Sequence, residues 1–446
     1  MVYGLIMMMV ALAVPLWAQA KNVSPFLVKD IHVGALPSAP ASLTASGGRV
    51  FFRADDGKHG LELWKSDGTS RGTRLVADIR SGSEHAVPDA LTDVDGALYF
   101  RADDGIHGTE LWRSDGTAAG TYLVADLNPG PKGSFPSELT NIHGVLYFQV
   151  HDGQHGTELW RSDGTTSGTK RLEALNPFRQ NDRIDDFELW SGRPSAKQTH
   201  LVLDIHPGAS SSLPHAFVSR NNTLYFIADD GRHGLELWQS QGTAESTKLA
   251  VDVNPGRAHA FIKGLTVVGS TLFFSAFDSE TNVELWRSDG TPSGTRRVVD
   301  LNPGLGHAYV DELTGMRDML YFRAFHPDYG FELWRSDGSA KGTSLVTDLR
   351  VGTDSSHPSE LLLADDRLFF RADDGTHGFE LWQSDGTAAG TRLVVDLMPG
   401  PRHSMLSELT YASNQLFFRA DDGEHGVELW AIPLPLTQNQ HVMTQQ

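Results

Sequence analysis

Short apolar runs separated by turn-forming residues recur along almost the whole chain. In one unit the runs cover residues 123–127, 138–140, 145–148 and 158–162, and turns such as Asn128-Pro129-Gly130 and Asp163-Gly164-Thr165 divide them. Runs of this length, rich in β-branched and aromatic residues, predict short strands. No apolar stripe of helical spacing and helical length accompanies them. The pattern therefore predicts an all-β protein with four strands in each unit.

The unit repeats with a fixed period. Successive tryptophans of the triplet Glu-Leu-Trp are 48 residues apart, except for one spacing of 30 residues. Four strands in such a period are typical of propeller blades, whereas β-solenoid coils, the alternative, are usually shorter. We expect a single β-propeller of about eight four-stranded blades, with one tryptophan of each triplet packed between blades as a structural core. These residues are Trp64, Trp112, Trp160, Trp190, Trp238, Trp286, Trp334, Trp382 and Trp430.

The two ends of the repeat array complement each other. Residues 26–31 resemble the strand at 75–79 but lack preceding strands of their own, and the last unit stops after Trp430 without a fourth strand. Pairing the N-terminal strand with the last blade would close the ring and remove two exposed sheet edges. The propeller is thus expected over residues 22–432, followed by a flexible tail at 433–446.

One unit, near residues 171–205, is truncated. It has lost about 18 residues and its Leu-Tyr-Phe strand, which leaves a two-strand remnant. The remnant could bulge from an eight-bladed ring or form a thin ninth blade, and we favour eight because larger rings are uncommon.

The N-terminus and the composition indicate export. Residues 1–20 combine an apolar run with Ala18-Gln19-Ala20, a small-residue cleavage pattern, so we interpret them as a signal peptide although no Lys or Arg precedes the run. The net charge of −19 argues against nucleic-acid partners. The absence of cysteine excludes disulfides, thiol catalysis and cysteine-based zinc sites. A secreted, extracellular or periplasmic location without a membrane span is expected.

The motif itself carries a resemblance. Residues 110–117, Glu-Leu-Trp-Arg-Ser-Asp-Gly-Thr, and their copies resemble the bacterial ELWxxDGT repeat family over essentially the whole mature chain. The resemblance implies an exported or surface-associated bacterial protein. It brings no activity and no catalytic residues.

Two sets of polar residues are candidates for binding. The loops between the second and third strands carry Asp-Asp-Gly-x-His-Gly, which most simply braces a turn but could also hold Ca²⁺ through clustered oxygen ligands. The loops after Asn-Pro-Gly vary most and carry histidines at one register, which could face a metal or an anion. The candidate calcium ligands are Asp55, Asp56, Asp103, Asp104, Asp373, Asp374, Asp421 and Asp422, and the candidate ligand-face histidines are His85, His259, His307 and His403. In two divergent loops, Phe277 and Tyr329 could present aromatic surface.

The sequence favours binding over catalysis. A residue present in every blade usually has a structural role, and neither a non-repeated acidic pair nor an arginine cluster stands out. We therefore expect a non-catalytic binding or scaffold propeller whose ligand is an extracellular glycan or protein. A propeller-type glycan hydrolase or lyase and a calcium-stabilised structural module remain as alternatives.

Overall fold

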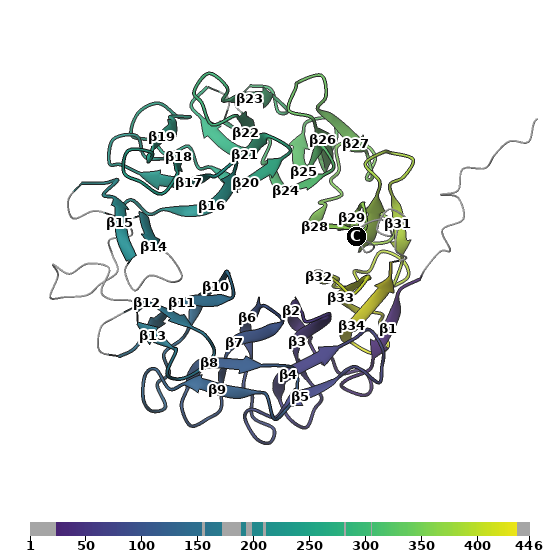
Figure 1. Ribbon diagram of the computed structural model, residues 1–446. Helices are drawn as coiled ribbons and strands as arrows, with labels where there is room; N and C mark the ends of the chain where they lie inside the picture. The colour runs from purple at the N-terminus through teal and green to yellow at the C-terminus, as the bar shows by residue number, and fades with distance from the viewer. Residues whose placement is uncertain are drawn as a thin grey trace, which may run out of the picture.

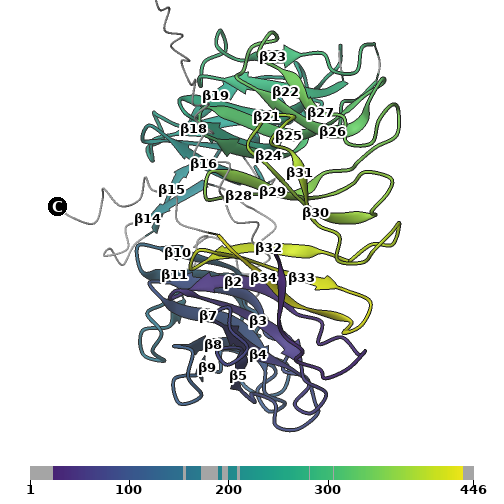
Figure 2. The ribbon, with the colours of Figure 1, turned by 90° about the vertical axis from the view of Figure 1, so that its right-hand side faces the viewer.

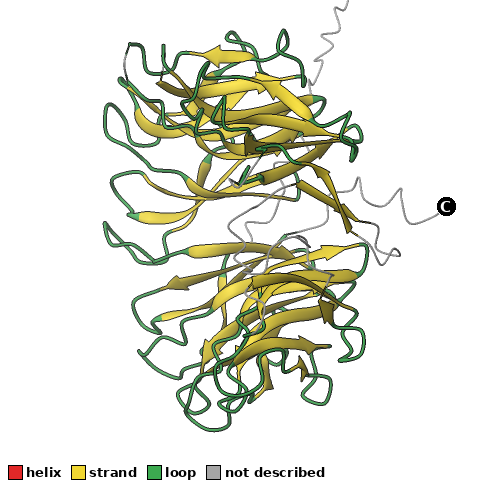
Figure 3. Cartoon of the chain, turned by 90° about the vertical axis from the view of Figure 1, so that its left-hand side faces the viewer, coloured by secondary structure: helices red, strands yellow, loops and turns green. Residues whose placement is uncertain are grey.

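The chain folds into a ring of antiparallel sheets. The computed structural model describes residues 24–153, 157–171, 189–192, 199–207, 211–280, 282–304 and 306–434. These residues form eight four-stranded sheets and one two-stranded sheet (Figure 1). Strands and loops make up all of the described chain (Figure 3). The prediction of an eight-bladed β-propeller is confirmed. No helix in the described ranges is long and apolar enough to span a bilayer.

Each blade is a four-stranded meander. Its first strand lies nearest the centre of the ring, and its fourth strand lies at the rim. The first, innermost strands are β2 (Ala41–Ser46), β6 (Asp89–Val94), β10 (Ser137–Ile142), β16 (His215–Arg220), β20 (Lys263–Val268), β24 (Asp311–Met316), β28 (Ser359–Ala364) and β32 (Ser407–Ala412). The second strands are β3 (Arg49–Asp55), β7 (Ala97–Asp103), β11 (Val145–His151), β17 (Thr223–Asp229), β21 (Thr271–Asp278), β25 (Met319–His326), β29 (Arg367–Asp373) and β33 (Gln415–Asp421).

The Glu-Leu-Trp triplets lie on the third strands. These are β4 (Leu61–Ser66), β8 (Thr109–Ser114), β12 (Thr157–Ser162), β18 (Leu235–Ser240), β22 (Asn282–Ser288), β26 (Gly330–Ser336), β30 (Phe379–Ser384) and β34 (Val427–Pro433). The outermost strands are β5 (Arg74–Ala77), β9 (Tyr122–Ala125), β13 (Lys170–Arg171), β19 (Lys248–Val251), β23 (Arg296–Val299), β27 (Ser344–Thr347), β31 (Arg392–Val395) and β1 (Phe26–Lys29).

The ring closes as the sequence predicts. The N-terminal strand β1 pairs antiparallel with β34, and Leu27 lies opposite Trp430. The purple β1 therefore lies beside the yellow β34 in both views (Figures 1 and 2). Because the first strand of the chain completes the last blade, neither end of the array leaves an unpaired edge at this junction. Residues 1–23, with the predicted signal peptide, lie outside the described residues.

The shortened unit occupies its own place in the ring. Its two strands, β14 (Leu189–Gly192) and β15 (Thr199–Leu203), pair with each other and lie between the β10–β13 blade and the β16–β19 blade (Figure 1). This remnant is thinner than the eight full blades, and the backbone of Trp190 belongs to it. At the other end, β34 continues through Pro433, and Leu434 is buried, so the described blade extends slightly beyond residue 432. Residues 435–446 lie outside the description.

Alternation along the third strand places its side chains on opposite faces of the blade. Leu111 packs with Phe148 of the following blade, whereas Trp112 packs with Phe100 and with Leu63 of the preceding blade. Successive strand residues point to opposite faces, and both faces of a blade are covered, so both residues are core residues. Trp64, Trp112, Trp238, Trp334, Trp382 and Trp430 are buried, and Trp160 and Trp286 are half-buried.

Candidate ligand-binding face

One position in each blade has a left-handed backbone, and its side chain is exposed in seven of the eight blades. It lies in the loop just before the innermost strand, at the start of that strand, and its φ is between +47° and +53° in all eight blades. We call this set the mouth ring: Ala39, Val87, Phe135, Leu213, Phe261, Tyr309, His357 and Met405. Six of its members are exposed large hydrophobic residues, from 43% exposed at Val87 to 59% at Phe261.

Backbone hydrogen bonds hold the mouth ring between two blades. The N–H of Val87 donates to the carbonyl of Leu61, at the start of the third strand of the preceding blade. The carbonyl of the neighbouring Ala86 accepts the N–H of Asp103, at the end of the second strand of its own blade. The residue that precedes each mouth-ring residue is a buried Ser or Ala. Each loop is therefore fixed from both sides, and its conformation does not depend on the exposed side chain.

A buried glutamate of the Glu-Leu-Trp motif lies beside seven of these loops, and the glutamate that precedes the Leu213 loop lies outside the described residues. Glu428, from the Glu-Leu-Trp motif of the last blade, accepts the backbone N–H of Ser38 at 3.0 Å and its hydroxyl at 2.6 Å. Glu332 holds Ser356 in the same way. Burial raises the pKa of Glu62, Glu332 and Glu380 to about 7 and that of Glu236 to about 8. The glutamate of the motif is thus a cap for the loop that presents the mouth ring.

The backbone of the mouth ring is constant, but its side chains are not. A non-glycine residue in the left-handed region costs about 1–2 kcal/mol, and Val87 is β-branched, which makes that conformation especially unfavourable. Strain of this kind persists where the surrounding structure imposes it, and it concentrates at ligand-binding positions. Seven residue types occupy this strained position, and seven of the eight side chains are exposed, so the packing of the blades does not determine which residue stands there.

Aromatic rings connect part of the mouth ring into a continuous arc. His259 contacts Phe261, with ring centroids 5.8 Å apart, and Phe261 contacts Phe277 at 6.1 Å. The chain of contacts continues through His307, Tyr309 and Phe331 and ends where Phe331 stacks on His357 at 5.3 Å. We call this set the aromatic arc: His259, Phe261, Phe277, His307, Tyr309, Phe331 and His357. It crosses from the β20–β23 blade to the β28–β31 blade.

Arginines occupy one equivalent position on the second strand of five consecutive blades. We call them the arginine row: Arg323, Arg371, Arg419, Arg53 and Arg101. The other three blades hold Gln149, Ile227 and Ser275 there. Arg101 bonds the carbonyl of Pro136, which directly follows the mouth-ring residue Phe135 of the next blade. The row therefore lies beside the mouth ring. No arginine cluster stands out in the sequence, where these residues are 48 or more positions apart, and strand register shows that they occupy one equivalent position.

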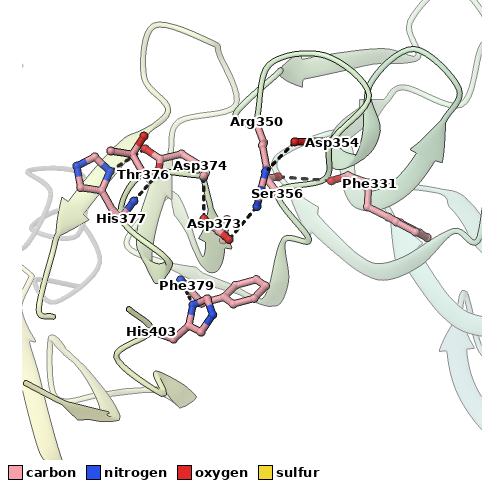
Figure 4. A network of polar contacts seen from close by, with 12 residues as sticks. Phe331, Arg350, Asp354, Ser356, Asp373, Asp374, Thr376, His377, Phe379 and His403 are labelled. Atoms are coloured by element: carbon pink, nitrogen blue, oxygen red, sulfur yellow. Dashed lines mark hydrogen bonds and ion pairs between the residues drawn. The ribbon is translucent and has the colours of Figure 1, made fainter. Parts of the chain in front are cut away.

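The four predicted histidines lie two residues before members of the mouth ring. His85, His259, His307 and His403 each accept, through Nδ1, the backbone N–H of the first or second residue of a third strand, at 2.8–3.2 Å. Figure 4 shows the bond between His403 and Phe379. With Nδ1 an acceptor, the neutral imidazole carries its proton on Nε2 and offers a ligand a donor. The observed role of the four side chains is therefore to hold the loop before the mouth ring against the third strand of the preceding blade.

The predicted aspartates are bonded within their own loops. Asp374 accepts the backbone N–H groups of Thr376 and His377 and also contacts His377 Nδ1 at 2.8 Å (Figure 4). Burial raises the pKa of Asp374, but these hydrogen bonds outweigh it and the net shift is downward, while the Asp374 contact raises the pKa of His377. Asp373 accepts the N–H of Gly375 and pairs with Arg350 at 3.0 Å.

The other predicted aspartate pairs repeat this arrangement. Asp56, Asp104 and Asp422 bond the histidine of their own loop, and Asp55, Asp103 and Asp421 accept the N–H of the following glycine. Over the described ranges, no three His, Asp or Glu side chains gather as a metal site. The structure thus places these carboxylates in turns, and calcium binding stays a prediction.

The sequence analysis missed the mouth ring and found only part of the arc. Phe277 belongs to the arc, as suggested, whereas Tyr329 packs against His326 and Trp334 instead. A signal for the mouth ring was present, because Val87, Phe135 and His357 precede proline, which disfavours the right-handed helical region for them. An apolar residue before proline in an otherwise polar loop, repeated with changing identity, is that signal.

Comparisons with known proteins place the chain only by fold. No family model and no curated protein matches it. Among solved structures, it resembles a prolyl endopeptidase (14% identity, 78% of this chain and 56% of that chain, TM-score 0.40) and puromycin hydrolase (12%, 90% and 60%, 0.44). It also resembles Saccharomyces cerevisiae Sqt1 (10%, 93% and 97%, 0.43). The chain spans less than two thirds of the length of the first two proteins, and scores this low carry no functional inference.

Proposed function

We propose that this protein is a secreted or surface-associated, non-catalytic binding propeller that holds an extracellular glycan or protein at the mouth ring. The observation that carries the proposal is the mouth ring itself. One strained backbone position recurs in all eight blades, its side chain is exposed in seven of them, and seven residue types occupy it. Similar loops that act together gain avidity from multivalency. Export and membership of the ELWxxDGT repeat family belong to the same proposal, and they rest on the N-terminal pattern and on the motif.

The test is affinity electrophoresis through gels that contain defined polymers: neutral polysaccharides, acidic polysaccharides, mucin as a glycoprotein and gelatin as an unglycosylated protein. We expect at least one polymer to retard the protein, and we expect the double variant Phe261→Ala, Tyr309→Ala to lose the retardation. The matched control is Ile142→Ala, Leu363→Ala. It removes two similarly exposed apolar side chains at the other end of the innermost strands, 41% and 39% exposed.

Two results would contradict the proposal. Equal loss of retardation in the control variant would mean that the mouth ring has no special part in binding. Release of new chain ends from a retarding polysaccharide would mean that the protein is an enzyme, as in the hydrolase or lyase alternative. A melting temperature that falls when calcium is chelated would support the calcium-stabilised module.

A further inference from the structure

Within the arginine row, three arginines have a carboxylate nearby and two, in adjacent blades, do not. Arg101 and Arg323 have Asp89 and Asp311 as their cross-strand partners on the innermost strand, and they pair with them at 2.7 and 3.3 Å. Arg53 also reaches Asp89, at 3.6 Å. Three of the five arginines therefore lie beside a carboxylate, and Arg53 and Arg101 share the same one.

Arg371 and Arg419 have no such partner. Their cross-strand positions hold Ser359 and Ser407. The blades of Arg101 and Arg323 have aspartate there, and the blade of Arg53 has Ala41. Within the part of the chain that the structure describes, neither guanidinium forms an ion pair or donates a hydrogen bond, and the Nε atom of each is buried without a partner. The Nε atom of Arg323 is buried without a partner as well, so Arg371 and Arg419 differ from it in lacking an ion pair at their terminal nitrogens, where an anion from outside the chain could bind.

Contacts with aromatic rings hold one of these cations in place. The guanidinium carbon of Arg371 lies over the ring of Phe379, 4.3 Å from its centroid. Phe379 in turn contacts His403, and Arg323 lies over Phe331 at the end of the aromatic arc. A cation fixed on an aromatic face is partly desolvated and pre-oriented, which strengthens its bond to an incoming anion.

An open pocket of about 380 Å³ lies between the innermost strands of these same two blades. Its lining includes Ser407, which is paired in register with Arg419, and Glu360, whose carboxyl is influenced by Arg371. Glu360 and Glu408, which also line the pocket, are turned toward the next blade, where they accept the backbone N–H groups of Leu409 and Leu43. The carboxylates therefore serve as inter-blade links, and the arginines remain for a ligand.

We propose that Arg371 and Arg419 bind the carboxylates of an acidic polysaccharide, a uronic-acid glycan whose sugar rings lie along the aromatic arc. This inference rests on the proposed binding function of the same face and names the chemical class of its ligand. The net charge of −19 opposes the approach of any polyanion, so the attraction has to come locally, from the two unpaired cations at one place. The aromatic arc ends at His357, in the loop that leads into the blade of Arg371.

Geometry favours a glycan chain over a folded acidic partner. Stable protein interfaces need a continuous apolar core that excludes water, with polar groups at the rim. The mouth ring instead distributes its apolar side chains over eight separate blades, and the imidazoles of His259, His307 and His357 lie among them. A polysaccharide is flexible, and each of its sugar units has an apolar ring face and several hydroxyl groups. Each unit can therefore contact both the aromatic side chains and the polar groups of this curved surface.

The experiment measures affinity for three uronate polysaccharides, polygalacturonate, alginate and hyaluronate, and for the methyl ester of polygalacturonate, which has the same sugar chain but no charged carboxylates. We expect at least one uronate to bind the full-length protein, and Arg371→Gln, Arg419→Gln to weaken that binding about tenfold or more, with the affinity for the ester unchanged. Arg74→Gln, Arg296→Gln is the matched control. It removes the same charge at exposed positions on two outermost strands.

If the glutamine variant does not fold, Arg371→Lys, Arg419→Lys keeps the charge and is expected to retain part of the uronate affinity. The salt dependence of wild-type binding tests the same point without any variant. Equal affinity for acid and ester, or an equal loss in the control, would overturn the acidic ligand and leave the binding function intact. Tighter binding to polyglutamate or to an oligodeoxynucleotide would overturn the glycan, and the absence of binding to every polysaccharide would remove the inference together with its basis in a glycan ligand.

Discussion

The mouth ring and the neighbouring second-strand positions have the same backbone in all blades, but their side chains divide the ring into two parts. Blades β10–β13, β16–β19 and β20–β23 lack the arginine row and carry Phe135, Leu213 and Phe261 in the mouth ring. The other five blades carry the arginines, with His357 and Met405 beside the two that are unpaired. Two positions per blade thus change while the backbone stays constant. The motif builds a symmetrical scaffold, and a few exposed positions make its two parts chemically different.

The largest predicted effect is a loss of stability when a tryptophan between two blades is removed, and it should be equal in both parts of the ring. Trp238→Ala, in an arginine-free blade, and Trp382→Ala, in an arginine blade, should each lower the free energy of unfolding by about 3–5 kcal/mol, because each leaves a cavity between blades. Denaturant unfolding measures it. A loss in one variant and none in the other would mean that the blades are not equivalent supports.

The buried glutamates predict a pH response that is also common to both parts. Their pKa is raised in the folded state, to about 8 for Glu236 and about 7 for Glu380, from an ordinary value near 4.5. A raised folded pKa means that the contribution to stability is complete below the unfolded pKa and is lost as the pH rises through 7–8. The melting temperature should therefore fall between about pH 5 and about pH 9.

Glu236→Gln and Glu380→Gln should each flatten that decline, since glutamine stays neutral over the whole range. The loop aspartates act oppositely, because hydrogen bonds lower the pKa of Asp104 and Asp374 despite their burial. Their contribution is lost only as the pH falls below their ordinary range. A melting temperature that rises from about pH 5 to about pH 9 would contradict this assignment.

Supplying the missing acids would make the unpaired arginines resemble the paired ones. Ser359→Asp, Ser407→Asp should lower the affinity for the best uronate about tenfold, because each new carboxylate occupies its arginine as Asp89 occupies Arg101. Titration calorimetry with the uronate and its ester separates this effect from a general loss of binding. Unchanged uronate affinity would show that the two guanidinium groups do not contact the ligand.

The smallest predicted effect concerns the strain itself. Phe261→Gly and Val87→Gly should each stabilise the fold by up to about 1 kcal/mol, since glycine adopts a positive φ without a steric cost. Only Phe261→Gly should weaken ligand binding, because Val87 lies outside the aromatic arc. Thermal unfolding with parallel binding measurements checks both statements, and destabilisation by both glycines would indicate that the exposed side chains support the fold.

Most of the architecture was predictable because period and pattern encode it directly. The spacing of Trp64, Trp112 and their copies gives the blades, and the solitary strand at residues 26–31 gives the closure. The site was less accessible. The difference between Arg101 and Arg371 depends on the residue opposite each one, Asp89 or Ser359, which only the register reveals. The left-handed φ of the mouth ring is likewise imposed by contacts with two blades, and no local sequence encodes it alone.

The most direct test is a crystal structure of the full chain with a bound oligouronate. We predict electron density along the aromatic arc, with sugar rings over Tyr309 and His357 and a carboxylate within hydrogen-bonding distance of Arg371 or Arg419. Density on the opposite end of the channel or on the outermost strands, with the mouth ring empty, would contradict the account.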